Sequence, residues 1–289
     1  MKNKLLKTGA VLLGGIILLV ILLAARAAGM NSLQPDVEPA DSMPTVRDGA
    51  VERLSGAIRI ESISPTSDEP EQIAPFDDLH AYLEQEFPRT HRELEREKIE
   101  PCSLLYTWEG SNPDLKPAIF MSHLDVVPVE EGNLDDWEHP PFSGAVVDGF
   151  IWGRGTLDIK TGVVGILEAT ETLLEAGERP ERTHIYAFGC DEEIGGRLGA
   201  KKLAAELESR DVQAESVLDE GLAIVTGIMP GVDNPVGVVG IAEKGFLTLE
   251  IEARAQGGHS SMPPKTTAAG ILARAVTRHP LTDDELPPP

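Results

Sequence analysis

Histidine and carboxylate residues follow short apolar runs at four separate places in this sequence. The residues concerned are His123, Asp125, Asp158, Asp191, Glu192, Glu193, Asp219 and Glu220. Carboxylates gathered in one place repel each other, so a fold that collects them needs a cation. Nitrogen and oxygen ligands without thiolate suit zinc, with manganese or cobalt as substitutes. The pattern therefore predicts a metal centre in which one carboxylate bridges two ions about 3.5–4 Å apart.

The spacing within these groups suggests a task for each residue. On a strand, residues two apart face the same way, so Asp125 can orient the ring of His123. Of the adjacent Glu192 and Glu193, one can bind metal while the other acts as a general base on a bridging water. Asp158 follows a turn with two glycines and precedes a helical pattern, and we predict that it bridges the ions. Each motif alone is weak, because surface histidines and solvated glutamate pairs are common.

An α/β sheet is predicted to position these side chains, because strand-like apolar runs alternate with amphipathic segments. The predicted strands are Cys102–Trp108, Ala118–Ser122, Ala145–Trp152, Thr183–Cys190, Ser216–Leu218 and Val236–Ala242. Helices are predicted at Thr161–Ala176, around Ala200–Leu207, from Phe76 onward and over Leu94–Ile99. We expect a mostly parallel sheet with helices on both faces, and a site beyond the carboxyl ends of its strands.

The N-terminal segment favours a membrane anchor. Lysines at positions 2, 4 and 7 precede 18 uncharged residues, Thr8 to Ala25, rich in Leu, Ile and Val. As a helix this stretch would rise about 27 Å, close to the thickness of the hydrocarbon core of a bilayer. A cleaved secretory signal is the alternative, since Ala25–Ala27 resembles a cleavage site. Both interpretations place the remainder outside the cytoplasm, either on a single-pass anchor with a cytoplasmic N-terminus or as a secreted domain.

The overall charge limits the kinds of partner that the protein can bind, and the cysteine count bears on the compartment in which it folds. With 48 acidic against 25 basic residues and a formal net charge of −23, nucleic acid and anionic membrane surfaces are excluded as main partners. Two cysteines, Cys102 and Cys190, are too few for a disulfide framework. Cys190 ends an apolar run, which favours a buried free thiol. A bridge to Cys102 is the alternative if the domain lies outside the cytoplasm.

The pattern changes after residue 243 and indicates a second, smaller domain. Residues 246–255 alternate apolar and polar side chains, a glycine-rich loop with His259 follows, and an Ala-rich helix is expected around 268–278. We predict an anchor or signal at 1–28, a proline-containing linker at 29–50, the first part of a catalytic domain at 51–243, and an incomplete α+β lid or dimerisation domain at 244–289.

Five motifs occur in the order found in one enzyme family. They are the runs 121–129 (MSHLDVVPV), 153–160 (GRGTLDIK), 191–196 (DEEIGG), 218–221 (LDEG) and 257–261 (GGHSS). Over roughly residues 75–280 the sequence resembles the co-catalytic dizinc peptidases, which include aminoacylases, carboxypeptidase S and the secreted N-fatty-acyl-amino-acid synthase/hydrolases. The ordered set is far more specific than any single motif.

The resemblance implies a set of zinc ligands. His123, Asp158 and Asp219 would hold one zinc ion, while Asp158 and Glu193 would hold the other. Asp219 is the ligand in the carboxypeptidase S branch, and elsewhere in the family a glutamate serves, so Glu220 is the alternative. Family members place a further zinc-binding histidine after the lid domain. This sequence ends inside the lid, so we expect a fragment of a longer enzyme whose second zinc keeps only two ligands from the chain.

The resemblance also implies catalytic roles. Asp125 would support the zinc-binding histidine, and Glu192 would be the general base. His259 resembles the lid-domain histidine that stabilises the oxyanion in the partner's site of dimeric members, which implies a homodimer through the lid. A loop histidine that caps a turn is an equally good interpretation of His259.

The expected function is zinc-dependent hydrolysis of amide bonds in peptides or N-acyl amino acids, of carboxypeptidase or aminoacylase type. A metal-bridged water would attack the carbonyl carbon after Glu192 removes its proton. The alternative from another class is a catalytically inactive, membrane-anchored binding or scaffold protein. A cytoplasmic dipeptidase is disfavoured by the N-terminal segment, and the sequence does not separate an exopeptidase from an acyl-amino-acid hydrolase.

Overall fold

The structure is a computed structural model that describes residues 2–29, 45–221, 224–227, 231–242, 244–245, 249–255 and 266–278. The chain divides into two units, Met1–Val46 and Arg47–Pro289. The first unit contains helix α1, Lys2–Ala28. Among the described residues, no helix combines the length and the apolar character needed to cross a membrane. The domain boundaries expected at residues 28, 50 and 243 stay predictions.

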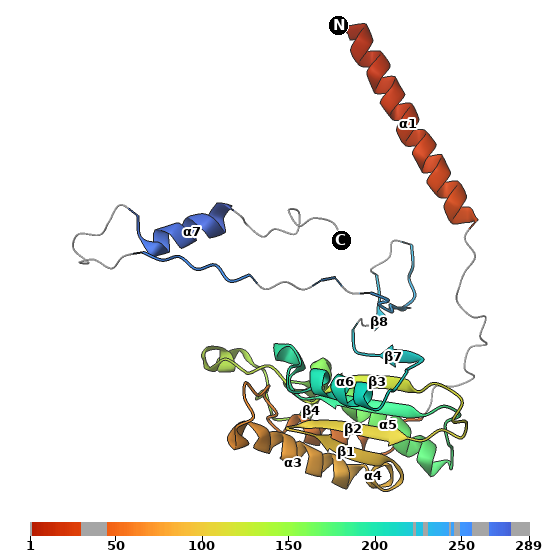
Figure 1. Ribbon diagram of the computed structural model, residues 1–289, viewed down its shortest axis with the longest axis vertical. Coiled ribbons are helices and arrows are strands. Elements are labelled where there is room, and N and C mark those ends of the chain that lie inside the picture. The colour runs from red at the N-terminus through yellow and green to blue at the C-terminus, as the bar shows by residue number, and fades with distance from the viewer. Residues whose placement is uncertain are drawn as a thin grey trace. The chain divides into compact units, whose positions relative to one another are not determined.

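The second unit is built on a five-stranded sheet with the order β1-β2-β6-β3-β7 (Figure 1). Its strands are Glu95–Ile99 (β1), Ser103–Trp108 (β2), His184–Gly189 (β6), Ala118–His123 (β3) and Ser216–Leu218 (β7). Strand β2 is antiparallel to both of its neighbours, whereas β3 is parallel to β6 and to β7. All strands except β2 therefore run in one direction. The predicted α/β fold with a mostly parallel sheet is confirmed.

Helices cover both faces of this sheet (Figure 1). One face carries α2 (Ala50–Ile58), α3 (Pro70–Glu86), α4 (Pro88–Glu93) and α5 (Thr161–Glu175), and the other carries α6 (Ala200–Ser209). Successive side chains of a strand point to opposite faces, and β2 follows this rule. Leu104 and Tyr106 join the larger core cluster under α2–α5, while Leu105 packs with Leu203 of α6. Burial on both faces explains why β2, β3 and β6 read as continuous apolar runs.

One predicted strand is a hairpin instead. Residues 145–152 form strands β4 (Ala145–Val147) and β5 (Phe150–Trp152), which pair antiparallel with each other. Asp148 and Gly149 turn the chain with positive φ angles of 51° and 84°. An Asp-Gly pair adopts this backbone readily, and it is a strong hairpin signal that the single-strand prediction overlooked.

A predicted helix is also wrong. Residues 95–99 were expected to be helical and form strand β1, which pairs with β2 from Glu95–Thr107 to Ile99–Ser103. Their charged side chains suit an edge strand that faces solvent, and the pairing with β2 overrides the local helix preference.

The elements after β7 are short. Strand β9 covers only Val236–Gly237 of the predicted strand 236–242 and pairs with β8 (Ile224–Val225). Residues 249–255 form no strand, whereas helix α7 spans Ala268–Arg278 as predicted. Short helical turns occur at Glu131–Asp136, Thr156–Lys160 and Glu192–Ile194. His259 lies outside the described residues.

The two cysteines form a disulfide bond. Cys102 precedes β2 and Cys190 follows β6, and their Cα atoms lie 5.7 Å apart. The register pairs Leu104 with Phe188, so the two cysteines occupy opposite positions just beyond the paired residues. The expected free thiol at Cys190 is therefore wrong, and the alternative of a Cys102–Cys190 bridge is correct.

Candidate metal centre

Three residues from three different elements meet at the carboxyl edge of the sheet. His123 ends β3, Asp158 lies on the turn at 156–160, and Glu220 follows β7. The Nε2 atom of His123 lies 3.2 Å from Oδ1 of Asp158 and 3.4 Å from Oε1 of Glu220. One ligand atom from each residue lies within 4.8 Å of the others, an arrangement that can hold a metal ion. Two of these three residues are predicted ligands, and the third is the predicted alternative.

Two further predicted residues, Glu192 and Asp219, lie beside this group. Oε2 of Glu192 lies 3.9 Å from Nε2 of His123. Asp219 lines a cavity of about 310 Å³ together with His123 and Glu192, and its Oδ1 accepts a hydrogen bond from the backbone N–H of Glu220. The structure thus places Glu220 rather than Asp219 directly beside the histidine. The assignment of Asp219 as ligand stays a prediction.

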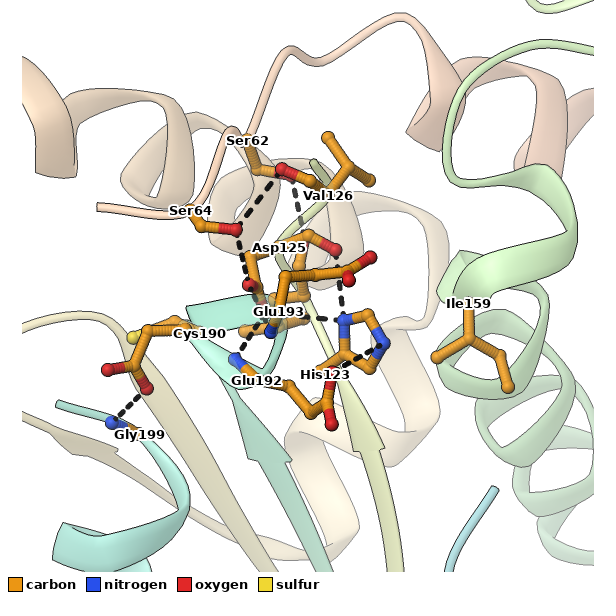
Figure 2. Close-up of polar contacts among 12 residues, drawn as sticks. Ser62, Ser64, His123, Asp125, Val126, Ile159, Cys190, Glu192, Glu193 and Gly199 are labelled. Atoms are coloured by element: carbon orange, nitrogen blue, oxygen red, sulfur yellow. Dashed lines mark hydrogen bonds and ion pairs between the residues drawn. The ribbon is translucent and has the colours of Figure 1, made fainter. Parts of the chain in front are cut away.

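Asp125 is the buried centre of a hydrogen-bond network (Figure 2). Its Oδ1 accepts from the N–H of Glu192 at 3.1 Å, and its Oδ2 accepts from the N–H of Glu193 at 3.3 Å. The Ser64 hydroxyl also donates to Oδ2, at 2.7 Å. Nδ1 of His123 lies 3.0 Å from the carbonyl oxygen of Asp125 and 3.2 Å from its Oδ1. With its proton on Nδ1, the ring presents Nε2 to the outer carboxylates.

The role of Ser64 had no signal in the sequence. It lies before α3, 61 residues upstream of Asp125, in a stretch without a motif. A backbone bridge between Ile63 and Val126 brings the two segments together, which only the folded chain reveals.

The electrostatics of the group indicate an excess of negative charge. Burial lowers the pKa of His123, yet its bond to Asp125 and the charges of Asp125, Glu220 and Glu192 raise it to about 9 overall. Burial raises the pKa of Glu192, and Asp125 is among the carboxylates that raise it further, against the opposing effect of His123. The pKa of Glu193 is also raised, first by burial and then by the negative charge of Asp158. Glu193 is not among the three described residues that form the candidate metal-binding group.

A divalent cation fits this donor set. In the described part of the chain, no lysine or arginine forms an ion pair with Asp158, Glu192, Glu193, Asp219 or Glu220. Among the described side chains, the repulsion that contributes to the raised carboxyl pKa values is therefore relieved by His123 and by no lysine or arginine. Imidazole nitrogen with carboxylate oxygen is the ligand chemistry of zinc.

The turn that carries Asp158 is anchored by a buried lysine. The Nζ atom of Lys160 donates to the carbonyl oxygens of Ala57 at 3.1 Å and Ile60 at 2.5 Å, at the end of α2. Burial lowers the pKa of Lys160 to about 7. Gly155 has a φ of 82°, and a Cβ atom there would lie 2.5 Å from Val126, so the turn requires glycine. Lys160 was part of a recognised motif, but sequence reasoning gave it no role.

Comparisons with known proteins identify the family of the chain. The profile of peptidase family M20/M25/M40 matches residues 119–286, more than half of the chain. The chain belongs to this family. The resemblance to carboxypeptidase S and the N-fatty-acyl-amino acid synthase/hydrolases is thereby confirmed.

Two relatives place the chain more closely within family M20. It is 41% identical over 277 residues to probable carboxypeptidase S-like 2 of Dictyostelium discoideum, covering 92% of this chain and 52% of that protein. It is 43% identical over 230 residues to N-fatty-acyl-amino acid synthase/hydrolase PM20D1 of Xenopus tropicalis, covering 79% of this chain and 44% of that protein. The chain thus spans about half the length of these relatives.

A solved structure supports the fold. An M20 family metallo-carboxypeptidase, Sso-CP2 from Sulfolobus solfataricus, superposes with a TM-score of 0.50 at 24% identity, covering 62% of this chain and 38% of that chain. At this identity the similarity shows the architecture of the M20 fold.

Proposed function

We propose that this chain forms the metal centre of a zinc-dependent hydrolase that cleaves amide bonds in peptides or N-acyl amino acids. The observation that carries the proposal is the convergence of Asp158 and Glu220 on Nε2 of His123, with distances of 3.2 and 3.4 Å. The names of the relatives, a carboxypeptidase S-like protein and an N-fatty-acyl-amino acid synthase/hydrolase, support the two substrate classes.

The chain's residues divide between two metal positions in this proposal. His123, Asp158 and Glu220 would hold one zinc ion, with Asp219 as the alternative to Glu220. Asp158 and Glu193 would hold a second ion, whose charge would offset the repulsion by which Asp158, after burial, raises the pKa of Glu193. Zinc at such a site polarises a bound carbonyl group and lowers the pKa of water.

Glu192 is the proposed general base. It takes a proton from the attacking water and returns it to the departing amine. Burial and the surrounding carboxylates raise its pKa, which makes it a stronger proton acceptor than an ordinary glutamate. Asp125 holds the backbone N–H of Glu192, so the base and the ring of His123 are fixed by the same carboxylate.

The substitution Glu192→Gln tests this proposal. It keeps the shape of the side chain and removes its basicity, so hydrolysis of an N-acyl amino acid by the 289-residue chain should fall by at least about 100-fold. Zinc content, measured by atomic emission after dialysis, should stay at the wild-type value. Unchanged turnover in the variant would show that Glu192 is not the base. A wild-type chain that binds zinc without turnover would favour a binding or scaffold function.

We propose in addition that the chain is exported, either held at the membrane by its N-terminal segment or secreted, with the Arg47–Pro289 unit outside the cytoplasm. The three lysines before 18 uncharged residues support this orientation. Fractionation of cells with an alkaline carbonate wash tests the anchor, and a glycosylation reporter tests the side of the membrane. Release of the intact chain into the soluble fraction would contradict the anchor.

We also propose that the 244–289 segment supports a homodimer in which His259 reaches the partner's site. The motif that contains His259 supports this assignment by resemblance alone. Light scattering coupled to size-exclusion chromatography measures the mass directly. A monomer at every concentration tested would contradict the proposed dimer.

A further inference from the structure

The loop that joins β6 to α6 carries both Glu192 and Glu193. The residue before them, Asp191, connects the two ends of this loop through hydrogen bonds. Asp191 is 1% exposed. Its Oδ2 accepts a hydrogen bond from the N–H of Leu198 at 2.6 Å, and its Oδ1 accepts one from the N–H of Gly199 at 2.7 Å. Figure 2 shows the bond at Gly199, beside Cys190. A single carboxylate thus ties the beginning of the loop to its end.

The backbone of Asp191 strengthens this closure. Its carbonyl oxygen accepts from the N–H of Gly196 at 2.8 Å and from that of Ile194 at 3.3 Å. A Cβ atom at Gly199 would lie 2.6 Å from the backbone nitrogen of Cys190 and 2.7 Å from Oδ1 of Asp191. The two ends of the loop therefore approach closely enough to require glycine.

The other fixed point of the loop is Asp125, which accepts hydrogen bonds from the N–H groups of Glu192 and Glu193. The loop is held between two buried carboxylates, Asp125 just after β3 and Asp191 just after β6. No lysine or arginine among the described residues forms an ion pair with Asp191, so backbone N–H groups at the beginning of α6 meet its charge.

We propose that Asp191 is a positioning residue that fixes the general base and the metal-binding glutamate by closing this loop. The role rests on the proposed functions of Glu192 and Glu193. The two carboxylate oxygens of Asp191 accept from the backbone N–H groups of Leu198 and Gly199. An asparagine in this place would point its side-chain NH2 group at one of these backbone N–H groups, so that two donors face each other. Asp191→Asn therefore keeps the volume of the side chain and removes one of the two hydrogen bonds that connect the ends of the loop.

A matched control comes from another buried carboxylate that binds the backbone. Glu171 on α5 is 1% exposed, and its Oε1 accepts a hydrogen bond from the N–H of Thr90 at 2.7 Å. It lies about 15 Å along the helix from Thr161, where α5 begins beside the metal centre. Glu171→Gln removes a comparable interaction without touching the loop.

The experiment measures zinc binding by calorimetry and amide hydrogen exchange by mass spectrometry in the full chain. Asp191→Asn should raise the Kd for zinc by about 10-fold to 100-fold and speed the amide hydrogen exchange of residues 192–199. Glu171→Gln should leave both unchanged, although it lowers the melting temperature. Wild-type zinc affinity and exchange in Asp191→Asn would overturn the proposal, as would an equal loss of zinc affinity in Glu171→Gln.

Two outcomes keep this test separate from the proposed function. If Asp191→Asn does not fold, the wild-type chain still decides: the amides of Leu198 and Gly199 should be protected, and exchange at the rate of an unfolded peptide would overturn the closure. If the wild-type chain binds no zinc, the proposed hydrolase fails, whereas the exchange of residues 192–199 in Asp191→Asn still decides whether Asp191 holds the loop.

Discussion

The inner and outer halves of the metal centre are built differently. The side chains of His123 and Asp125 are 2% and 0% exposed, and Asp125 receives hydrogen bonds from a hydroxyl group and two backbone N–H groups. The side chains of Asp158 and Glu192 are 68% and 53% exposed, and among the described residues His123 is the only one that forms an ion pair with either. The inner half is fixed by folding, whereas the outer half is left free for metal and substrate.

Because of this difference, the two halves contribute to different properties of the protein. Residues of the inner half contribute to the stability of the metal-free protein, because their polar groups would be buried without partners if one were removed. Residues of the outer half contribute chiefly once a cation relieves their repulsion.

The largest effect is expected when Asp125 is compared with Asp158. Asp125→Ala leaves the Ser64 hydroxyl and two backbone N–H groups without their acceptor, so the free energy of unfolding should fall by about 3 kcal/mol. Asp158→Ala should change it little in metal-free protein, because that side chain is exposed. Urea denaturation in the presence of a chelator measures both. Equal destabilisation by the two substitutions would remove the distinction between the halves.

The pH dependence of the metal-free protein should report on His123. Its pKa is raised from 6.5 to about 9, so the folded state binds this proton more tightly than the unfolded state. The stability that His123 contributes is therefore fully present below pH 6.5 and lost as the pH rises through 9. The difference in unfolding free energy between wild type and His123→Asn should shrink over this range. A difference that is constant with pH, or that grows, would contradict the assigned environment.

The smallest effect separates Ser64 from its neighbour Ser62. Both hydroxyls are buried; Ser64 donates to Oδ2 of Asp125, and Ser62 donates to the carbonyl oxygen of Leu124 at 2.6 Å. Each change to alanine should lower the free energy of unfolding by about 1 kcal/mol. Only Ser64→Ala should also weaken zinc binding, by about tenfold, because only Ser64 supports the carboxylate behind His123. Equal zinc affinities would assign Ser64 a purely structural role.

The sequence predicted the outline of this site because each ligand follows a buried strand or a glycine turn. Apolar runs placed His123 and Glu220 at strand ends, and the parallel sheet brings such ends together. The choice between Asp219 and Glu220 was not predictable in this way, because it depends on which side chain turns toward His123 after β7 ends.

Other features escaped prediction because they depend on pairing between distant segments. Strand β1 has a charged, helix-like composition and becomes a strand only through its pairing with β2. The Cys102–Cys190 bond follows from the register of β2 and β6, which single-strand patterns do not contain. The loop closure at Asp191 likewise depends on Gly199, eight residues away, packing against the end of β6.

The most direct test of the metal centre is a crystal structure of the chain soaked with zinc, with anomalous data collected at the zinc edge. We expect an anomalous peak about 2.0–2.1 Å from Nε2 of His123, with carboxylate oxygens of Asp158 and Glu220 at bonding distance. A zinc-loaded crystal with no peak at His123, or with the ion bound away from Asp158, would contradict this expectation.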